Sequence, residues 1–136
     1  MELTPDLLTS IPFIDMQHKD LINRINAVVA LGALSVSKEE TEKTLEFLRM
    51  YIDKHFNDEE IIQRQFGYPK YEWHRGQHQY YISECMKLNA EYKKNGPSAQ
   101  FTLILNKSII DWIIKHIKTA DVELGQYVNS QKKRHA

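Results

Sequence analysis

Five of the six histidines in this sequence stand where a helical chain would bury apolar side chains. Apolar residues recur at spacings of three and four through most of the chain, which is the pattern of amphipathic helices. His18, His55 and His116 each lie in such a stripe, and His74 and His78 share another. Burying five imidazoles is costly unless each has a partner, so the chain is restricted to helical folds in which these stripes meet.

The stripes and the residues at their boundaries predict an all-α protein of four helices, forming one domain over residues 1–136. Ser37 and Glu40 form a capping box before the second helix, and Gly67 is expected to end it. Pro69 can open the third helix, and Ser98 can cap the fourth. The predicted helices cover residues 15–34, 38–66, 69–93 and 98–118, and a short C-terminal segment covers 121–136.

Short connections between these helices favour an up-down-up-down antiparallel four-helix bundle. When helices alternate in direction, the start of one lies beside the end of the next. His18 is near the start of the first helix, His55 and Glu59 lie late in the second, and His74 begins the third. With His116 near the end of the fourth helix, all of these polar residues fall at one end of the bundle and can form a common site in the core.

The spacing within this set is that of metal ligands. Residues four apart on a helix share a face, so His55 with Glu59 and His74 with His78 can each present two side chains to one centre. One buried histidine is more often a hydrogen-bonded core residue, but the whole set is not explained in that way. Imidazoles mixed with carboxylates suit iron, manganese or zinc better than calcium or magnesium. Cys85 lies seven residues beyond His78, which favours core packing for it.

Asp121 is ambiguous from its spacing. It follows His116 by five residues, which is a rotation of about 140° on a regular helix, so the two would not share a face. The helix could end there or contain a wide turn that returns the carboxylate to the site. Periodicity alone is equally compatible with a surface or capping residue. With Asp121 included, the seven donors exceed what one zinc ion uses and fit two ions bridged by carboxylates.

Four blocks of the sequence carry a resemblance to a known family. They are Ile14-Asp15-Met16-Gln17-His18-Lys19, His55-Phe56-Asn57-Asp58-Glu59-Glu60, His74-Arg75-Gly76-Gln77-His78 and His116-Ile117-Lys118-Thr119-Ala120-Asp121. Together they resemble hemerythrins, in particular the single-domain bacterial ones. The resemblance covers nearly the whole chain, and it favours Asp121 as a ligand because the family has a bridging aspartate five residues after its last ligand histidine.

The resemblance implies a di-iron site and the role of each donor. His74, His78 and His116 would hold one iron, and His18 and His55 the other. Glu59 and Asp121 would bridge the two irons, beside an oxo or hydroxo bridge from solvent. In this family the iron with two histidines keeps an open position where dioxygen binds. Asp58 and Glu60, which flank Glu59, are expected to face solvent.

Four apolar residues near the ligand positions are expected to line an oxygen pocket. Leu21 stands one turn after His18, Phe56 adjoins His55, and Ile113 stands one turn before His116. Trp112 is the fourth, and it is equally compatible with ordinary core packing. The chain departs from the family at Ile113, where a leucine is common, and in the irregular segment before the first helix. Both departures concern the shape of the pocket more than the metal ligands.

The resulting expectation is reversible dioxygen binding by a carrier, store or delivery protein that is not an enzyme. One alternative is a di-iron oxidase, peroxidase or ferroxidase, although the Glu-x-x-His pairs of ferritin-like proteins are missing at these histidines. The other alternative is an oxygen-sensing or redox-sensing module. Dioxygen is the expected ligand, and an oxygen-consuming protein the expected recipient.

Charge and hydropathy bear on location and partners. Eighteen Lys and Arg balance eighteen Asp and Glu, which does not favour binding to nucleic acid or to an acidic membrane surface. No apolar run approaches the roughly 20 residues of a membrane span. With Cys85 as the single cysteine, we expect a cytoplasmic protein that is a monomer or a weak homo-oligomer.

Overall fold

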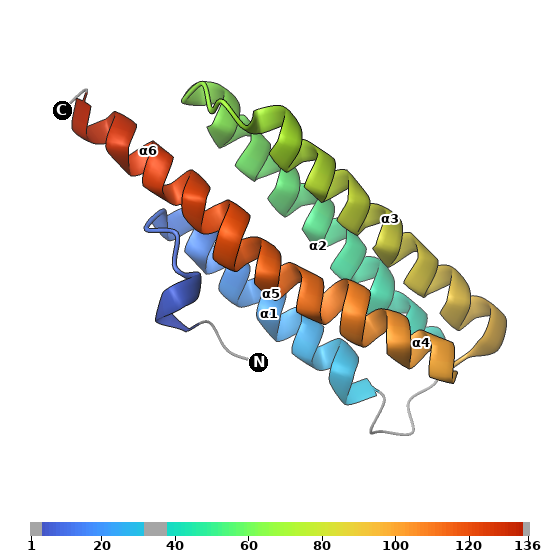
Figure 1. The fold of residues 1–136 in the computed structure, drawn as a ribbon. Helices are drawn as coiled ribbons and strands as arrows, with labels where there is room; N and C mark the ends of the chain where they lie inside the picture. The colour runs from blue at the N-terminus through green and yellow to red at the C-terminus, as the bar shows by residue number, and fades with distance from the viewer. Residues whose placement is uncertain (1–3, 32–37, 135–136) are drawn as a thin grey trace.

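The chain folds as an antiparallel four-helix bundle, which confirms the predicted fold class (Figure 1). A computed structural model describes residues 4–31 and 38–134. A short 3₁₀ turn, η1 (Pro5–Leu7), precedes the bundle. The first three helices of the bundle are α1 (Pro12–Leu31), α2 (Lys38–Gln65) and α3 (Tyr71–Asn95). The fourth is one rod of five segments: α4 (Ala99–Ile104), η2 (Leu105–Asp111), α5 (Trp112–His116), η3 (Ile117–Asp121) and α6 (Val122–Arg134).

Helix α1 starts earlier than the predicted residue 15, because Pro12 can occupy the first helical position without losing a hydrogen bond. The chain reaches it through Ser10, whose φ of 65° turns the backbone sharply. Asp15 lies in the first turn, and its carboxylate accepts hydrogen bonds from the backbone and hydroxyl of Thr9, both at 2.8 Å. The predicted end of this helix at residue 34 and the capping role of Ser37 lie outside the described residues.

The turns at the two ends of α3 follow the predicted signals with small shifts. Gly67 ends α2 with a φ of 60°, a conformation that glycine adopts without strain. The prediction that Pro69 opens α3 is wrong, because Pro69 lies in the turn and the helix begins at Tyr71. At the other end α3 runs to Asn95, two residues beyond the predicted 93. The Ser98 side chain caps the next helix by accepting a hydrogen bond from the Phe101 backbone at 3.0 Å, as predicted.

The last helix does not end at residue 118, and residues 121–136 are not a short separate segment. The rod passes through two π-helical stretches, η2 and η3, and continues as α6 to Arg134. It continues because α6 has an apolar face of its own: Leu124 and Val128 pack against Ile14 and Tyr68. The hydroxyl of Tyr81 donates a 2.9 Å hydrogen bond to the Ile109 carbonyl, within the first π-helical stretch.

Two apolar clusters lie on either side of the polar core residues. The main cluster includes Leu21, Ile52, Tyr81 and Ile113, each three residues from one of the core histidines. The second cluster consists of Ile11, Ile14, Tyr68, Leu124 and Val128, with Ile62, Phe66 and Tyr127 packed against it. The polar residues are therefore enclosed between two dry layers rather than open to solvent at the end of the bundle.

In the described ranges, no helix is both long and apolar enough to cross a membrane.

Gly125 allows the N-terminal segment to pack directly on α6, because a Cβ there would overlap the carbonyl oxygen of Thr9. We predict that Gly125→Ala lowers the free energy of unfolding by about 1–3 kcal/mol, since the buried Thr9 backbone must move. Gly76→Ala is the matched control, because nothing lies within 4 Å of a Cβ at that exposed helical position. It should stabilise the fold by about 0.5–1 kcal/mol. Urea unfolding of both variants measures the difference, and equal effects would contradict the close packing.

Candidate metal centre

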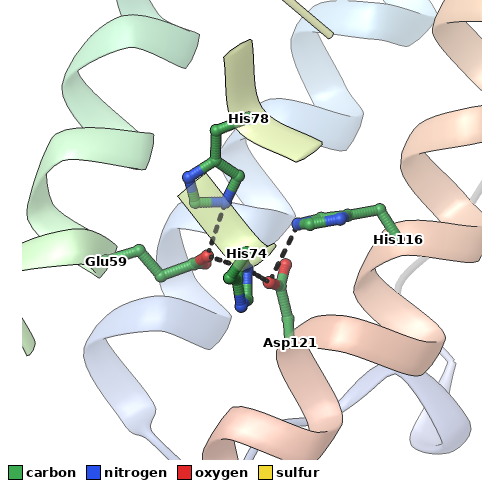
Figure 2. A group of neighbouring side chains, drawn as sticks. All are labelled: Glu59, His74, His78, His116 and Asp121. Atoms are coloured by element: carbon green, nitrogen blue, oxygen red, sulfur yellow. Dashed lines mark ion pairs between the residues drawn. The ribbon is translucent and has the colours of Figure 1, made fainter. Parts of the chain in front are cut away.

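Seven buried side chains from all four helices of the bundle point at one small region (Figure 2 shows five of them). They form two groups, and within each group the potential ligand atoms lie within 4.8 Å of one another. One group is Glu59, His74, His78, His116 and Asp121, and the other is His18, His55, Glu59 and Asp121. Glu59 and Asp121 belong to both groups. The tertiary fold thus brings together all seven residues that the sequence singled out.

Glu59 divides its two oxygens between the two groups. Its Oε1 lies 3.1 Å from Nε2 of both His74 and His78, which come from α3. Its Oε2 lies 3.2 Å from Nε2 of His55 and 3.5 Å from Nε2 of His18. A carboxylate placed in this way can bind one ion through each oxygen.

Asp121, like Glu59, directs one oxygen at each of the two groups of histidines. Its Oδ1 lies 2.8 Å from Nε2 of His74 and 3.1 Å from Nε2 of His116, whereas its Oδ2 lies 3.1 Å from Nε2 of His18. Both carboxylates therefore direct one oxygen at the group of three histidines and the other at the group of two. This arrangement separates two adjacent positions for cations, each with its own imidazoles.

The π-helical segment η3 explains how Asp121 shares a face with His116. Residues five apart come into line when the helix widens to i→i+5 hydrogen bonding, which a regular α-helix does not provide. The structure therefore realises the wide turn, one of the two possibilities left open by the sequence, and the helix does not end. His116 is the last residue of α5 and Asp121 the last of η3, so the widened turn lies between them.

The inward atoms of the cluster fit a metal site. The five Nε2 atoms and the four carboxylate oxygens are buried, and none makes a well-formed hydrogen bond to any residue in the described ranges. Buried polar atoms normally have partners, and this set faces only its own members across about 3 Å. Imidazole and carboxylate donors in this number suit a pair of transition-metal ions.

Charge in the cluster depends on what lies between the carboxylates. Burial favours the neutral form of Glu59 and Asp121, but the surrounding histidines outweigh it and hold the pKa of both carboxyl groups below its usual range. Burial likewise opposes the charged form of His18 and His74, yet the two carboxylates raise the pKa of each ring to about 10. In the metal-free chain, protons on the rings therefore balance the buried negative charge.

Three of the five histidines have a hydrogen-bond partner at Nδ1, the ring nitrogen that faces away from the centre. The partner is a glutamine for two of them and Glu60 for His78. His55 is held by Oε1 of Gln17 at 2.7 Å, and His116 by Oε1 of Gln77 at 2.7 Å. An acceptor at Nδ1 fixes the tautomer, so that Nε2 is the nitrogen turned toward the centre. Both glutamines lie within the sequence blocks quoted above, but they are off the apolar stripes, so periodicity did not identify them.

The expectation that Asp58 and Glu60 face solvent is wrong. Glu60 accepts a hydrogen bond from Nδ1 of His78 at 2.8 Å and is only 17% exposed. Asp58 accepts one from Gln17 at 2.9 Å, so it supports the residue that holds His55. The rotation of α2 about its own axis turns Asp58 toward α1 and Glu60 toward α3. This rotation depends on how the helices pack, so it cannot be predicted from the sequence of α2 alone.

The four residues expected around the oxygen pocket are placed differently from one another. Leu21, Phe56 and Ile113 are fully buried in the main cluster. Phe56 stacks on His78, with ring centroids 3.8 Å apart and planes 2° apart. Trp112 is half-buried and stacks on the outer side of His116 at 4.8 Å, where it borders a cleft of about 190 Å³. Trp112 thus contacts the group of three histidines.

Comparisons with known proteins point the same way as this geometry. The sequence model named Hemerythrin HHE cation binding domain matches residues 9–128. The chain is 27% identical over 120 residues to the bacteriohemerythrin of Methylococcus capsulatus, covering 86% of this chain and 87% of that protein. It is 28% identical over 125 residues to the bacteriohemerythrin of Campylobacter jejuni, covering 89% and 90%. A crystal structure of wild-type hemerythrin shares the fold with a TM-score of 0.81 at 24% identity, covering 94% of this chain and 97% of that one.

We predict that metal binding releases about two to three protons per chain at pH 7, because His18 and His74 are protonated in the metal-free fold and the pKa of His78 is also raised, and these rings must lose their protons to become ligands. Metal and protons compete for the same nitrogens, so the apparent affinity should rise with pH until the pH approaches 10. Calorimetric titration with Zn²⁺ in buffers of different ionisation enthalpy measures the release. A binding heat that does not depend on the buffer would contradict it.

Proposed function

This chain belongs to the hemerythrin family, and on that basis we propose that it binds two iron ions and, through them, dioxygen reversibly. The observation that carries the proposal is the division of each carboxylate between two groups of histidines. His74, His78 and His116 would hold one ion, and His18 and His55 the other. Glu59 and Asp121 would bridge them. When bound, the iron pair supplies the dioxygen-binding position and the electrons that pass reversibly to the gas.

The unequal number of histidines sets where a ligand can enter. With the two carboxylates shared, the side of His18 and His55 has one protein donor fewer than the side of His74, His78 and His116. A small molecule would therefore bind beside His18 and His55.

The chain's own residues hold, orient and shield this site. Gln17, Gln77 and Glu60 fix the rings of His55, His116 and His78 through Nδ1. Leu21, Phe56 and Ile113 present an apolar wall with exposed fractions of 0%, 2% and 1%. A dry wall keeps water and protons from the bound gas, which favours release over one-way oxidation.

We further propose that the protein works in the cytoplasm as an oxygen carrier, store or delivery protein for an oxygen-consuming protein, rather than as an enzyme. A buried free thiol at Cys85 is compatible with a reducing compartment. The match to bacteriohemerythrins over most of their length supports the carrier assignment.

An absorption experiment tests the proposed function. The reduced protein, loaded with about two iron ions per chain, is measured before and after exposure to air and then flushed with nitrogen. We expect a new visible band that disappears on removal of dioxygen and returns with air. One-way conversion with product formation would overturn reversible binding in favour of an oxidase. Elemental analysis that finds one zinc ion and no iron uptake would overturn the di-iron assignment.

The bridging roles predict that Glu59→Ala or Asp121→Ala lowers bound iron from about two ions per chain toward one or none, because each carboxylate offsets charge on both ions. Glu46→Ala on α2 and Asp111→Ala on the last rod are the matched controls, since both side chains are exposed. Iron analysis of folded variants, verified by far-UV circular dichroism, decides the matter. An Asp121→Ala protein that kept both irons and a normal oxygenated spectrum would show that Asp121 is not a bridge.

The apolar wall predicts that Leu21→Ala and Ile113→Ala speed the decay of the oxygenated spectrum, because each opens a path for water to the centre. Each should also cost about 2–5 kcal/mol of stability. Leu88→Ala controls for stability, since Leu88 is buried in the same cluster but lies about 15 Å of helix rise beyond His78. The decay is followed where all three variants remain folded. Equal decay rates in the three variants and wild type would contradict the wall assignment.

A further inference from the structure

A group of buried polar atoms without hydrogen-bond partners lies next to the seven donors. Gln63 has an exposed fraction of 0%, yet neither its amide nitrogen nor its amide oxygen bonds to any residue in the described ranges. The hydroxyl of Tyr68 and Nδ1 of His74 are also buried and unpartnered among those residues. Buried polar atoms without partners are uncommon and each needs an explanation.

These three residues are linked in pairs on the side of the centre where the α2–α3 turn lies. Gln63 stands one turn after Glu59 on α2, so its side chain leaves the same inward face on the side of the α2–α3 turn. Tyr68 lies in that turn, and its backbone N–H donates to the Gln63 carbonyl at 2.9 Å. The Tyr68 ring lies against the His74 ring, with centroids 6.3 Å apart. Tyr68 also belongs to the second cluster, whose other buried members, including Ile14 and Leu124, are apolar.

The outer contacts of the other rings show what is missing at His74. His55, His78 and His116 each have an acceptor oxygen at Nδ1, between 2.7 and 2.8 Å away. His74 has none within the described ranges, although its Nε2 faces both carboxylates, at 3.1 Å from Glu59 and 2.8 Å from Asp121. His18 also lacks one, but its neighbours one turn away, Ile14 and Ile22, are apolar.

We propose that Gln63, with Tyr68, is the outer partner that orients His74, joined to its Nδ1 through one buried water. The inference rests on the metal centre of the proposed function. A water in such a site needs two to four polar partners, and the Gln63 amide, the Tyr68 hydroxyl and His74 Nδ1 supply them. The water accepts the Nδ1 proton of His74 and donates to Oε1 of Gln63, which keeps Nε2 free to face the carboxylates. Gln63 is thus a positioning residue and not a ligand.

This role predicts two effects of Gln63→Leu. Loss of an outer partner typically weakens metal affinity 10–100-fold. In the metal-free chain the leucine leaves the buried Nδ1 proton of His74 without its acceptor, so the melting temperature should fall modestly. A purely structural role would also lower both quantities, but it would leave the hydrogen bond at Nδ1 of His74 in place.

The experiment measures Fe²⁺ affinity under nitrogen, by competition with a chelator, and the melting temperature of the metal-free protein. For Gln63→Leu we expect affinity to fall 10–100-fold and the melting temperature of the metal-free protein to fall by less than about 10 °C. Tyr68→Phe should also weaken affinity. Gln65→Leu, an exposed residue two positions away, should leave affinity at the wild-type value, and Gln77→Leu provides the reference for losing a direct outer bond.

Three results would overturn the inference. One is wild-type affinity in Gln63→Leu, and another is wild-type affinity in Tyr68→Phe. The third concerns the Zn²⁺-loaded protein labelled with ¹⁵N-histidine, in which we expect a slowly exchanging Nδ1 proton on His74 that disappears in Gln63→Leu. An unchanged signal in the variant would exclude Gln63 as the partner. If the wild-type chain bound no metal, the proposed function itself would fail, which the wild-type titration shows before any variant is compared.

Discussion

The structure depends on two buried carboxylates whose negative charge must be balanced by positive charge in the two groups of histidines that surround them. Glu59 and Asp121 face five imidazoles at about 3 Å, in a space enclosed by apolar side chains. Ionised groups are stable there only with charge partners. Protons on His18 and His74 supply the balancing charge in the metal-free chain, and bound metal ions would replace them. The bundle can therefore close around the cluster in either state.

The need to bring the Asp121 carboxylate to the centre accounts for the π-helical segment η3, where the last rod departs from regular α-helix geometry. Asp121 reaches the centre because η3 is π-helical, and the rod continues beyond η3 into α6. α6 in turn covers the second apolar cluster, on which Tyr68 and Ile14 depend for their burial. A single local change in helical winding thus joins ligand placement to packing of the last helix.

Hydrogen bonds between helices add orientation to this balance of charge. Gln17 comes from α1 and holds a ring on α2, whereas Glu60 comes from α2 and holds a ring on α3. Gln77 on α3 holds a ring on α5. Each contact ties one helix to the next around the bundle, so the rings cannot rotate without disturbing a neighbouring helix. The orientation of these three rings therefore depends on how the helices of the bundle pack against one another.

The sequence alone determined the helical class, the antiparallel order and the convergence of the polar residues, because apolar periodicity and short turns act within one helix or between neighbours. It also indicated the ligand set, by spacing for His55, Glu59, His74 and His78 and by resemblance for Asp121. Tertiary structure decided the winding of η3, the length of α6 and the inward turn of Asp58 and Glu60. The first depends on local i→i+5 hydrogen bonding, the second on contacts of α6 with residues distant in the sequence, and the third on the rotation of α2 against α1 and α3. A pattern that assumes 3.6 residues per turn in an isolated helix contains none of these.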